Sequence, residues 1–184
     1  MSNITISSEL REQVRQAREA YLQLANLGTE SKNQVLHAFA KALRTNTSKI
    51  LEANSLDVIE AEKMVQSGEL SESACKRVML NEAKIELMAQ NCESVAKLED
   101  PVGKVLQATR LDEGLDLYRV SCPIGVVLVI FESRPDVVVQ ISALAVKSGN
   151  AVILKGGREA VHSNRVLAEI LRQTADDFEG MPVN

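Results

Sequence analysis

Residues 123–158 read PIGVVLVIFESRPDVVVQISALAVKSGNAVILKGGR, and this stretch decides the fold. Two apolar runs, 124–131 and 151–154, stand on either side of a segment with helical spacing. Both runs are rich in β-branched residues and apolar on both faces, which is typical of parallel strands covered by helices on each side. Strand, helix, strand and helix in this order predict a right-handed βαβ crossover of a doubly wound sheet.

The helix between these strands should have Asp136 as its N-cap and Gly149 just beyond its last turn. A second helix is expected over 159–173, EAVHSNRVLAEILRQ, with Val161 and Leu167 among its inward residues. Another strand is expected to begin in GMPVN at 180–184. Two parallel strands are too few for a stable sheet, so we expect the sheet to be incomplete.

The chain before these strands divides into two segments. The pattern of residues 1–98 predicts five helices, over 7–27, from Ser31 onward, and over 47–66, 71–79 and 82–97. Gly28 should occupy the C′ position of the first helix, and Ser31 should begin the second in a capping box with Gln34. The composition then shifts at LEDPVGKV, and residues 99–122 predict a hairpin ribbon with one polar face, turning at DEG. The unit over 123–184 follows, which makes the chain an α/β protein.

Composition excludes several functions. The net charge is −4 and there are no Trp, two Tyr and three Phe residues, which argues against nucleic-acid binding. The apolar run 124–131 is too short to cross a membrane, and the polar N-terminus predicts no secretory segment. Three cysteines and two histidines lack metal-ligand spacing, so we expect no metal site and a reducing, cytoplasmic location.

Charged and glycine residues follow both predicted strands, where open α/β sheets bind their ligands. Lys155 would project as a fixed cation, Gly156 and Gly157 would allow close approach of the backbone, and Arg158 would add a forked cation suited to a phosphate. These residues predict a pocket for a nucleotide ribose and phosphate. The glycines equally fit a plain strand-to-helix turn, and for the cations, as for Arg134, a solvated surface charge is the more common role.

Residues 122–167, CPIGVVLVIFESRPDVVVQISALAVKSGNAVILKGGREAVHSNRVL, resemble the cofactor domain of the gamma-glutamyl phosphate reductases. EANSLDVIEAE, EDPVGKV and LDEGLDLYRV agree in the same order, so the resemblance covers nearly all of the chain. The combination of IFESRPDV with SGNAVILKGG is highly specific to that family. It belongs to the aldehyde dehydrogenase superfamily, whose Rossmann-like domain binds a dinucleotide without the G-x-G-x-x-G motif, which is absent here.

The resemblance implies a fold and a reaction. The fold would be aldehyde-dehydrogenase-like, with N-terminal helices, a hairpin and an incomplete Rossmann-like sheet over 123–184. The reaction would be the NADPH-dependent reduction of L-glutamyl 5-phosphate to glutamate 5-semialdehyde and phosphate, a step of proline biosynthesis. In this chemistry a cysteine thiolate displaces phosphate from the substrate, and hydride from NADPH reduces the resulting thioester.

Residue roles also follow from the resemblance. Lys155 matches a lysine that contacts the adenosine ribose, and Arg158 stands where NAD-preferring relatives often carry a glutamate, which favours NADP. Ser133 aligns with an asparagine that helps to bind the oxyanion, and Arg134 would contact the substrate together with Ser133. The remaining cofactor-binding residues expected are Ile130, Phe131, Glu132, Gly156 and Gly157.

The family's nucleophile lies in a Cys-Asn loop of a second domain, and this sequence contains no Cys-Asn pair. We expect Cys75, Cys92 and Cys122 to be packing residues, and the chain to be the inactive, cofactor-side portion of a longer reductase. The resemblance also implies self-association through the 105–122 ribbon and a contact with glutamate 5-kinase. The alternatives are a non-catalytic nucleotide-binding or assembly module, and a relative with another acyl substrate.

Overall fold

The computed structural model describes residues 7–178 and 181 and confirms the predicted α/β order of elements. The N-terminal helices precede an antiparallel hairpin and a parallel βαβα unit. The predicted strand in GMPVN lies outside the described residues, apart from Met181. The elements are α1 (Ser8–Leu24), α2 (Thr29–Thr45), α3 (Thr47–Gln66), α4 (Glu72–Val78), α5 (Glu82–Lys97), β1 (Val105–Asp112), β2 (Leu115–Val120), β3 (Val126–Ile130), α6 (Asp136–Ser148), β4 (Ala151–Lys155), the 3-10 helix η1 (Arg158–Ala160) and α7 (Val161–Asp176).

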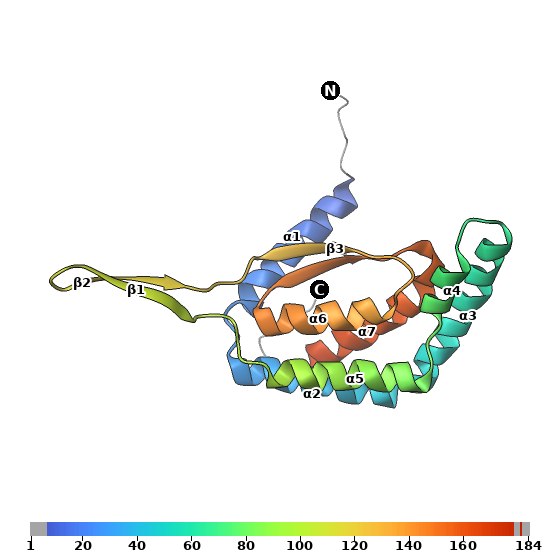
Figure 1. Ribbon diagram of the computed structural model, residues 1–184, viewed down its shortest axis with the longest axis horizontal. Helices are drawn as coiled ribbons and strands as arrows, with labels where there is room; N and C mark the ends of the chain where they lie inside the picture. The colour runs from blue at the N-terminus through green and yellow to red at the C-terminus, as the bar shows by residue number, and fades with distance from the viewer. Residues whose placement is uncertain (1–6, 179–180, 182–184) are drawn as a thin grey trace, which may run out of the picture.

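The elements form layers (Figure 1). The parallel pair β3–β4 lies over α6 and α7, and α2 and α5 form a further layer beneath these two helices. Helices α3 and α4 stand at one end of the molecule, while the β1–β2 ribbon projects from the other end. The main core fills the space between the helices; its fully buried members include Leu36, Leu43, Ile85, Met88, Val139 and Leu167.

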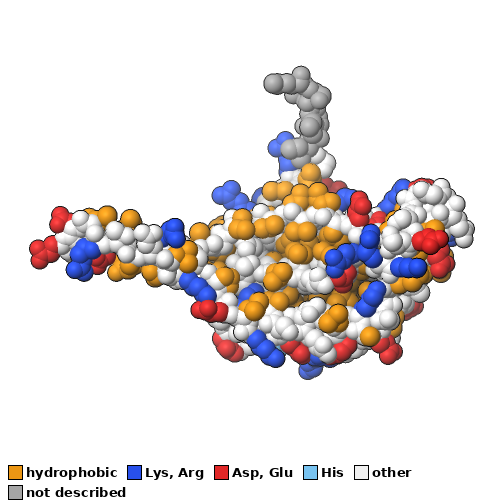
Figure 2. All heavy atoms as spheres, in the orientation of Figure 1, with side chains coloured by type: hydrophobic (Ala, Val, Ile, Leu, Met, Phe, Trp, Pro, Cys, Tyr) orange, Lys and Arg blue, Asp and Glu red, His pale blue; other side chains and the backbone are white. Residues whose placement is uncertain are grey.

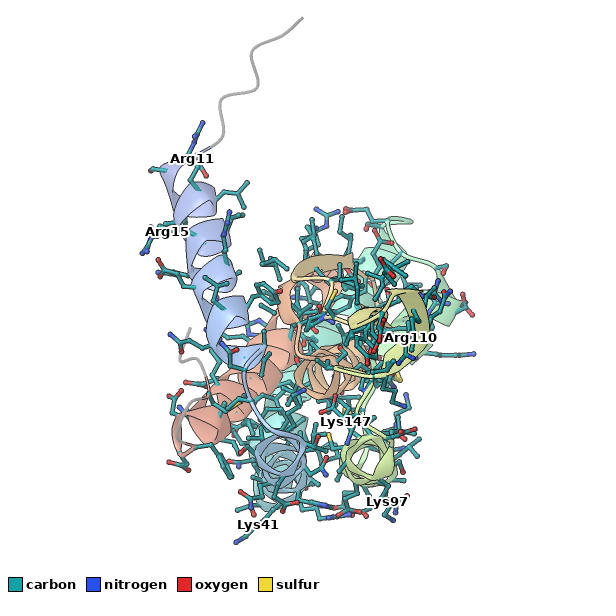
Figure 3. The ribbon with its side chains drawn as sticks, turned by 90° about the vertical axis from the view of Figure 1, so that its left-hand side faces the viewer. Arg11, Arg15, Lys41, Lys97, Arg110 and Lys147 are labelled. Carbon is teal, nitrogen blue, oxygen red and sulfur yellow. The ribbon has the colours of Figure 1, made fainter. Side chains whose placement is uncertain are left out.

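A buried lysine also joins these layers. Lys147 lies in the last turn of α6 and is 3% exposed. Its ammonium group donates hydrogen bonds to the carbonyl oxygen of Ala96 at 2.9 Å and to Oδ1 of Asn33 at 2.7 Å (Figure 3). Because Ala96 lies in the last turn of α5, the lysine satisfies a carbonyl group that the helix leaves free.

Two predicted helix boundaries were wrong. Helix α2 begins at Thr29, so Gly28, with φ −68°, is its N-cap and does not end α1. Asp100 accepts hydrogen bonds from Thr29 Oγ1 at 2.9 Å and from Lys32 Nζ at 3.0 Å, and these contacts fix the first turn of α2 ahead of Ser31. Asp136 is the first residue inside α6, because the preceding proline already has helical backbone angles.

The prediction that helices cover both faces of the sheet was also wrong for the described chain. Leu128 and Ile130 of β3 are 59% and 68% exposed. Figure 2 shows hydrophobic side chains gathered over β3 and the ribbon. Val161, expected to point inward, is 45% exposed at the start of α7. The crossover helix packs under one face of the sheet, whereas no helix in the described residues covers these side chains. None of the described helices is both long and apolar enough to span a membrane.

The ribbon has no buried side. Every residue of β1 and β2 is exposed, including Leu117 on one face and Tyr118 on the other, so the prediction of one polar face was wrong. The ribbon joins the body through Ser121, whose hydroxyl donates to Pro101 O at 2.6 Å and whose amide donates to Lys104 O at 2.9 Å. The ribbon is therefore attached at its base alone.

The start of α7 is held by a carboxylate from α3. Asp57, which is 1% exposed, accepts hydrogen bonds from the amide groups of His162 at 3.0 Å and Ser163 at 2.7 Å. One turn earlier, Asn54 donates to Val78 O at 2.8 Å and to Ser163 Oγ at 3.0 Å. Since Ala160 before the helix has no capping side chain, α3 provides the cap from a distance of about a hundred residues in the chain.

Replacing Asp57 with Ala should lower the free energy of unfolding by about 2 kcal/mol, because the buried amide of Ser163 and the partly buried amide of His162 lose their acceptor. Urea denaturation followed by circular dichroism measures the change. Glu62→Ala, at an exposed position of the same helix, is the matched control and should leave the midpoint within experimental error. Equal midpoints for the two variants would contradict the cap.

Candidate functional site

The carboxyl ends of β3 and β4 lie side by side. In the parallel register Ile130 pairs with Lys155, and the amide of Phe131 donates to the carbonyl oxygen of Lys155 at 3.1 Å. Paired residues of neighbouring strands project from the same face. Ile130 and Lys155 are therefore both exposed on the uncovered face, with the ammonium group at the edge where α/β sheets bind ligands.

The two glycines after β4 make room for side chains of the protein itself. A Cβ atom at Gly156 would overlap the amide group of Asn164, and one at Gly157 would overlap the carboxylate of Glu159. Gly157 has φ −74°, which any residue can adopt, so space rather than backbone freedom requires glycine here. The predicted close approach of backbone to ligand is thus joined by a second, internal reason for these glycines.

Arg158 is not an isolated cation. Its guanidinium forms an ion pair with Glu69, which follows α3 in the chain, and the arginine side chain is 75% exposed. Exposed ion pairs contribute little to stability because water and salt screen them. A bound phosphate could therefore replace Glu69 as the partner of Arg158 at small cost.

Ser133 lies in the loop after β3 in a backbone conformation that is uncommon for serine. Its φ angle is 55°, and it is 3% exposed. Its amide and its hydroxyl both donate to Oε1 of the buried Glu159, the hydroxyl at 3.2 Å. Because the hydroxyl proton points at Glu159, donation to an oxyanion would require the side chain to turn, and that role remains a prediction.

The neighbours of Ser133 face different surroundings. Glu132 is exposed, whereas Arg134 donates to Oδ2 of Asp136 at 2.9 Å. Arg134 also lines a cavity of about 310 Å³ between the N-terminus of α6 and helix α5. The other polar residues around this cavity are Arg77, Lys84, Asn91, Asp136 and Gln140. Three cations against one carboxylate give this cavity a positive balance.

A larger cavity of about 530 Å³ lies between α1, β4, α6 and α7. Phe131, Gly156 and Gly157 line it, together with Arg165 and Arg172 of α7. Its volume is in the range of small-molecule sites. The structure thus divides the predicted residues into four groups. Phe131 and the two glycines line the larger cavity, Arg134 lines the smaller one, and Ser133 is buried against Glu159. Ile130, Glu132, Lys155 and Arg158 are exposed at the strand ends and in the loops.

One feature of these residues favours a bound dinucleotide, and another limits how its phosphates could be held. Oδ1 of Asn164, beside Gly156, is buried and has no hydrogen-bond partner among the described residues, so it can accept from a ligand hydroxyl or amino group. The amide groups of His162 and Ser163, in the first turn of α7, already donate to Asp57 and are not free to bind a phosphate. Phosphate binding would therefore depend on the side chains of Lys155 and Arg158.

Sequence reasoning missed three residues at this site: Glu69, Glu159 and Asn164. Glu69 and Glu159 bind the distant residues Arg158 and Ser133, and Asn164 packs against Gly156 from the following helix. Nothing in the local sequence indicates these partners. The contacts of Gly156 with Asn164 and of Gly157 with Glu159 identify two of these residues, and they can be recognised only in the folded chain.

The cysteines agree with the expected packing role in two of three cases. Cys75 and Cys92 are buried, and Cys122 is exposed at the end of the ribbon. Burial, with a smaller contribution from the charge of Glu93, raises the pKa of the Cys92 thiol to about 12. A thiol with so high a pKa is a poor nucleophile at neutral pH.

Comparison with known proteins gives consistent matches. The sequence profile described as aldehyde dehydrogenase family matches residues 5–183. A gamma-glutamyl phosphate reductase from Natronomonas pharaonis is 51% identical over 162 residues, which are 88% of this chain and 37% of the relative. This chain therefore spans little more than a third of the length of that curated relative.

Solved structures agree with this match. The gamma-glutamyl phosphate reductase of Saccharomyces cerevisiae superimposes with a TM-score of 0.89 at 43% identity, over 97% of this chain and 45% of that one. A structure of PnpE in complex with nicotinamide adenine dinucleotide superimposes with a TM-score of 0.66 at 17% identity, over 91% of this chain and 31% of that one, and shows the shared fold.

Thiol chemistry tests the assignment of the cysteines. In the native chain at pH 8, Ellman's reagent should modify Cys122 and spare Cys75 and Cys92, and all three should react after unfolding. Because folding raises the pKa of Cys92 from 9.0 to about 12, the unfolded chain loses this proton first as the pH rises. The contribution of Cys92 to stability is complete below pH 9.0 and falls toward pH 12.

A Cys92→Ala variant is the control and should lose this alkaline decline in stability. Rapid modification of Cys92 in the native chain would contradict its burial.

Proposed function

This chain belongs to the aldehyde dehydrogenase family, and we propose that it forms the cofactor-binding part of an NADPH-dependent gamma-glutamyl phosphate reductase. Dehydrogenases of this family use a nicotinamide cofactor. The observation that carries the proposal is the 51% identity to a curated reductase over 162 residues, which include both strand-end loops. The reaction would reduce L-glutamyl 5-phosphate to glutamate 5-semialdehyde and phosphate.

Lys155 and Arg158 would hold the adenosine end of the cofactor. Lys155 is exposed at the end of β4, from where its ammonium group would contact the ribose, and the guanidinium of Arg158 would form two parallel hydrogen bonds to a 2′-phosphate. Ile130 shares the exposed face with Lys155, and Phe131, Gly156 and Gly157 line the adjoining cavity. The nicotinamide ring, when bound, supplies the hydride.

Arg134 would act on the substrate side. It lines the smaller cavity with Arg77 and Lys84, and this positive cavity suits a small molecule that carries carboxylate and phosphate groups. Ser133 belongs to the same loop, which supports a place near the substrate, whereas the exposed Glu132 would contact the cofactor.

The nucleophile of the reaction would come from outside these 184 residues. Cys75 and Cys92 are buried, and Cys122 lies between β2 and the start of β3, at the opposite end of β3 from the loop that carries Ser133. We therefore expect the chain by itself to bind NADPH without oxidising it in the presence of L-glutamyl 5-phosphate.

A second candidate function is assembly, because the ribbon exposes apolar side chains on both faces. Leu106, Leu117 and Tyr118 are 56%, 57% and 56% exposed, respectively. We propose that a second copy of this chain covers them, which also allows a module that binds nucleotide and assembles without catalysis.

Titration of the 184-residue chain with NADPH and NADH, followed by cofactor fluorescence, tests the cofactor site. Arg158→Ala should weaken NADPH binding about tenfold and leave NADH binding nearly unchanged, because only NADPH carries the 2′-phosphate. Glu69→Gln should have the opposite effect, a gain in NADPH affinity of about threefold, because it removes the competing carboxylate.

Arg119→Ala, at an exposed position of the ribbon, is the matched control and should change neither affinity. Equal losses for both cofactors in Arg158→Ala would remove the 2′-phosphate role from this residue.

Light scattering coupled to gel filtration tests the assembly. The double variant Leu117→Asp and Tyr118→Asp should shift the chain from a dimer toward a monomer, since a charge on each face prevents apolar contact. Thr109→Asp and Ala108→Asp, at the paired positions of β1, should act in the same direction. An unchanged mass for both pairs would exclude the ribbon as the contact surface.

A further inference from the structure

Beyond the strands, the two site loops are joined by one side chain. The last ladder hydrogen bond runs from the amide of Phe131 to the carbonyl oxygen of Lys155. Past this point, the hydrogen bonds between the two loops of the described chain are those that Ser133 donates to Glu159. Glu159 follows Arg158 in η1, so its side chain spans from the cofactor loop to the substrate loop.

The conformation of Ser133 depends on this contact. A left-handed backbone conformation costs a non-glycine residue on the order of 1 kcal/mol or more unless the surroundings hold it. Ser133, at φ 55°, is the described non-glycine residue with a positive φ angle. Glu159 accepts both of its donors in a buried environment, where the exposed fractions are 3% for Ser133 and 6% for Glu159.

The sequence around Glu159 is shaped to admit its side chain. The carboxylate folds back over Gly157, where even one methyl group would overlap both of its oxygens. No lysine or arginine in the described residues forms an ion pair with Glu159, so its polar contacts are those to Ser133. The glycine, the carboxylate and the strained serine therefore form one unit.

We propose that Glu159 is a positioning residue that fixes the β3–α6 loop against the β4–η1 loop. Without touching either ligand, it would set the distance between Arg134 on the substrate side and Lys155 and Arg158 on the cofactor side. This inference rests on the proposed function for its consequence, but the holding of Ser133 by Glu159 can be tested without any nucleotide.

Hydrogen exchange of the Ser133 amide, measured by NMR on the free chain, gives the direct readout. Glu159→Leu keeps the size of the side chain but has no acceptor, and it should speed exchange at Ser133 about a hundredfold while Leu154 in β4 changes little. Glu159→Gln retains an acceptor oxygen and should keep exchange within about tenfold of the parent chain.

NADPH titration gives the functional readout. Glu159→Leu should weaken binding about tenfold, and Glu159→Gln should restore most of this loss. Adding Ser133→Gly to Glu159→Leu should also recover affinity, because glycine adopts a positive φ without support. If Glu159 only stabilised its own loop, Ser133→Gly in the β3–α6 loop would not recover the lost NADPH affinity.

Gly157→Ser keeps Glu159 but displaces its carboxylate, and it serves if Glu159→Leu does not fold. It should speed exchange at Ser133, while Gly28→Ser, where a Cβ meets no atom within 4 Å, should not. Unchanged exchange at Ser133 in both Glu159→Leu and Gly157→Ser would overturn the inference, as would Glu159→Gln behaving like Glu159→Leu. If the parent chain fails to bind NADPH, the proposed function fails while the exchange result still decides the role of Glu159.

Discussion

The structure depends on the hydrogen bonds by which Asp57 closes the start of α7. The first amide groups of a helix have no acceptor within the helix, and for His162 and the buried Ser163 the acceptor comes from α3. This contact ties the N-terminal helices to the helix that follows β4. The loop between β4 and α7 is thereby fixed at both ends, by the strand ladder on one side and by Asp57 on the other.

The same interaction limits how the proposed site could hold a nucleotide. In a glycine-fingerprint site, the helix after the strand presents free amide groups to the phosphates. In this chain Asp57 occupies the amides of His162 and Ser163, so in the proposed site the phosphates would be held by the side chains of Lys155 and Arg158. The space left by the missing side chains of Gly156 and Gly157 is filled by the side chains of Asn164 and Glu159.

The sequence carried enough local information to predict the order of helices and strands. The β-branched runs, the helical spacing between them and Gly149, which adopts φ 69°, all act within a few residues. The placement of the predicted site residues at the strand ends follows from the same signals. Glu159 and Asp57 could not be predicted, because a buried acceptor is defined by a donor 26 or more than a hundred residues away. Ser133 was singled out by family resemblance, but its strained backbone is visible only in the folded chain.

The attachment of the ribbon at its base has a mechanical consequence. Because no core holds the two strands, the ribbon can rotate as a rigid unit about its base, where Ser121 contacts Pro101. A small rotation at the base displaces the tip at Gly114 by a larger distance. A partner bound to the tip would in turn restrict rotation at the base. Asp100 lies beside this base and forms an ion pair with Lys32 of α2. Binding at the tip of the ribbon would therefore also restrain the helices beneath the sheet.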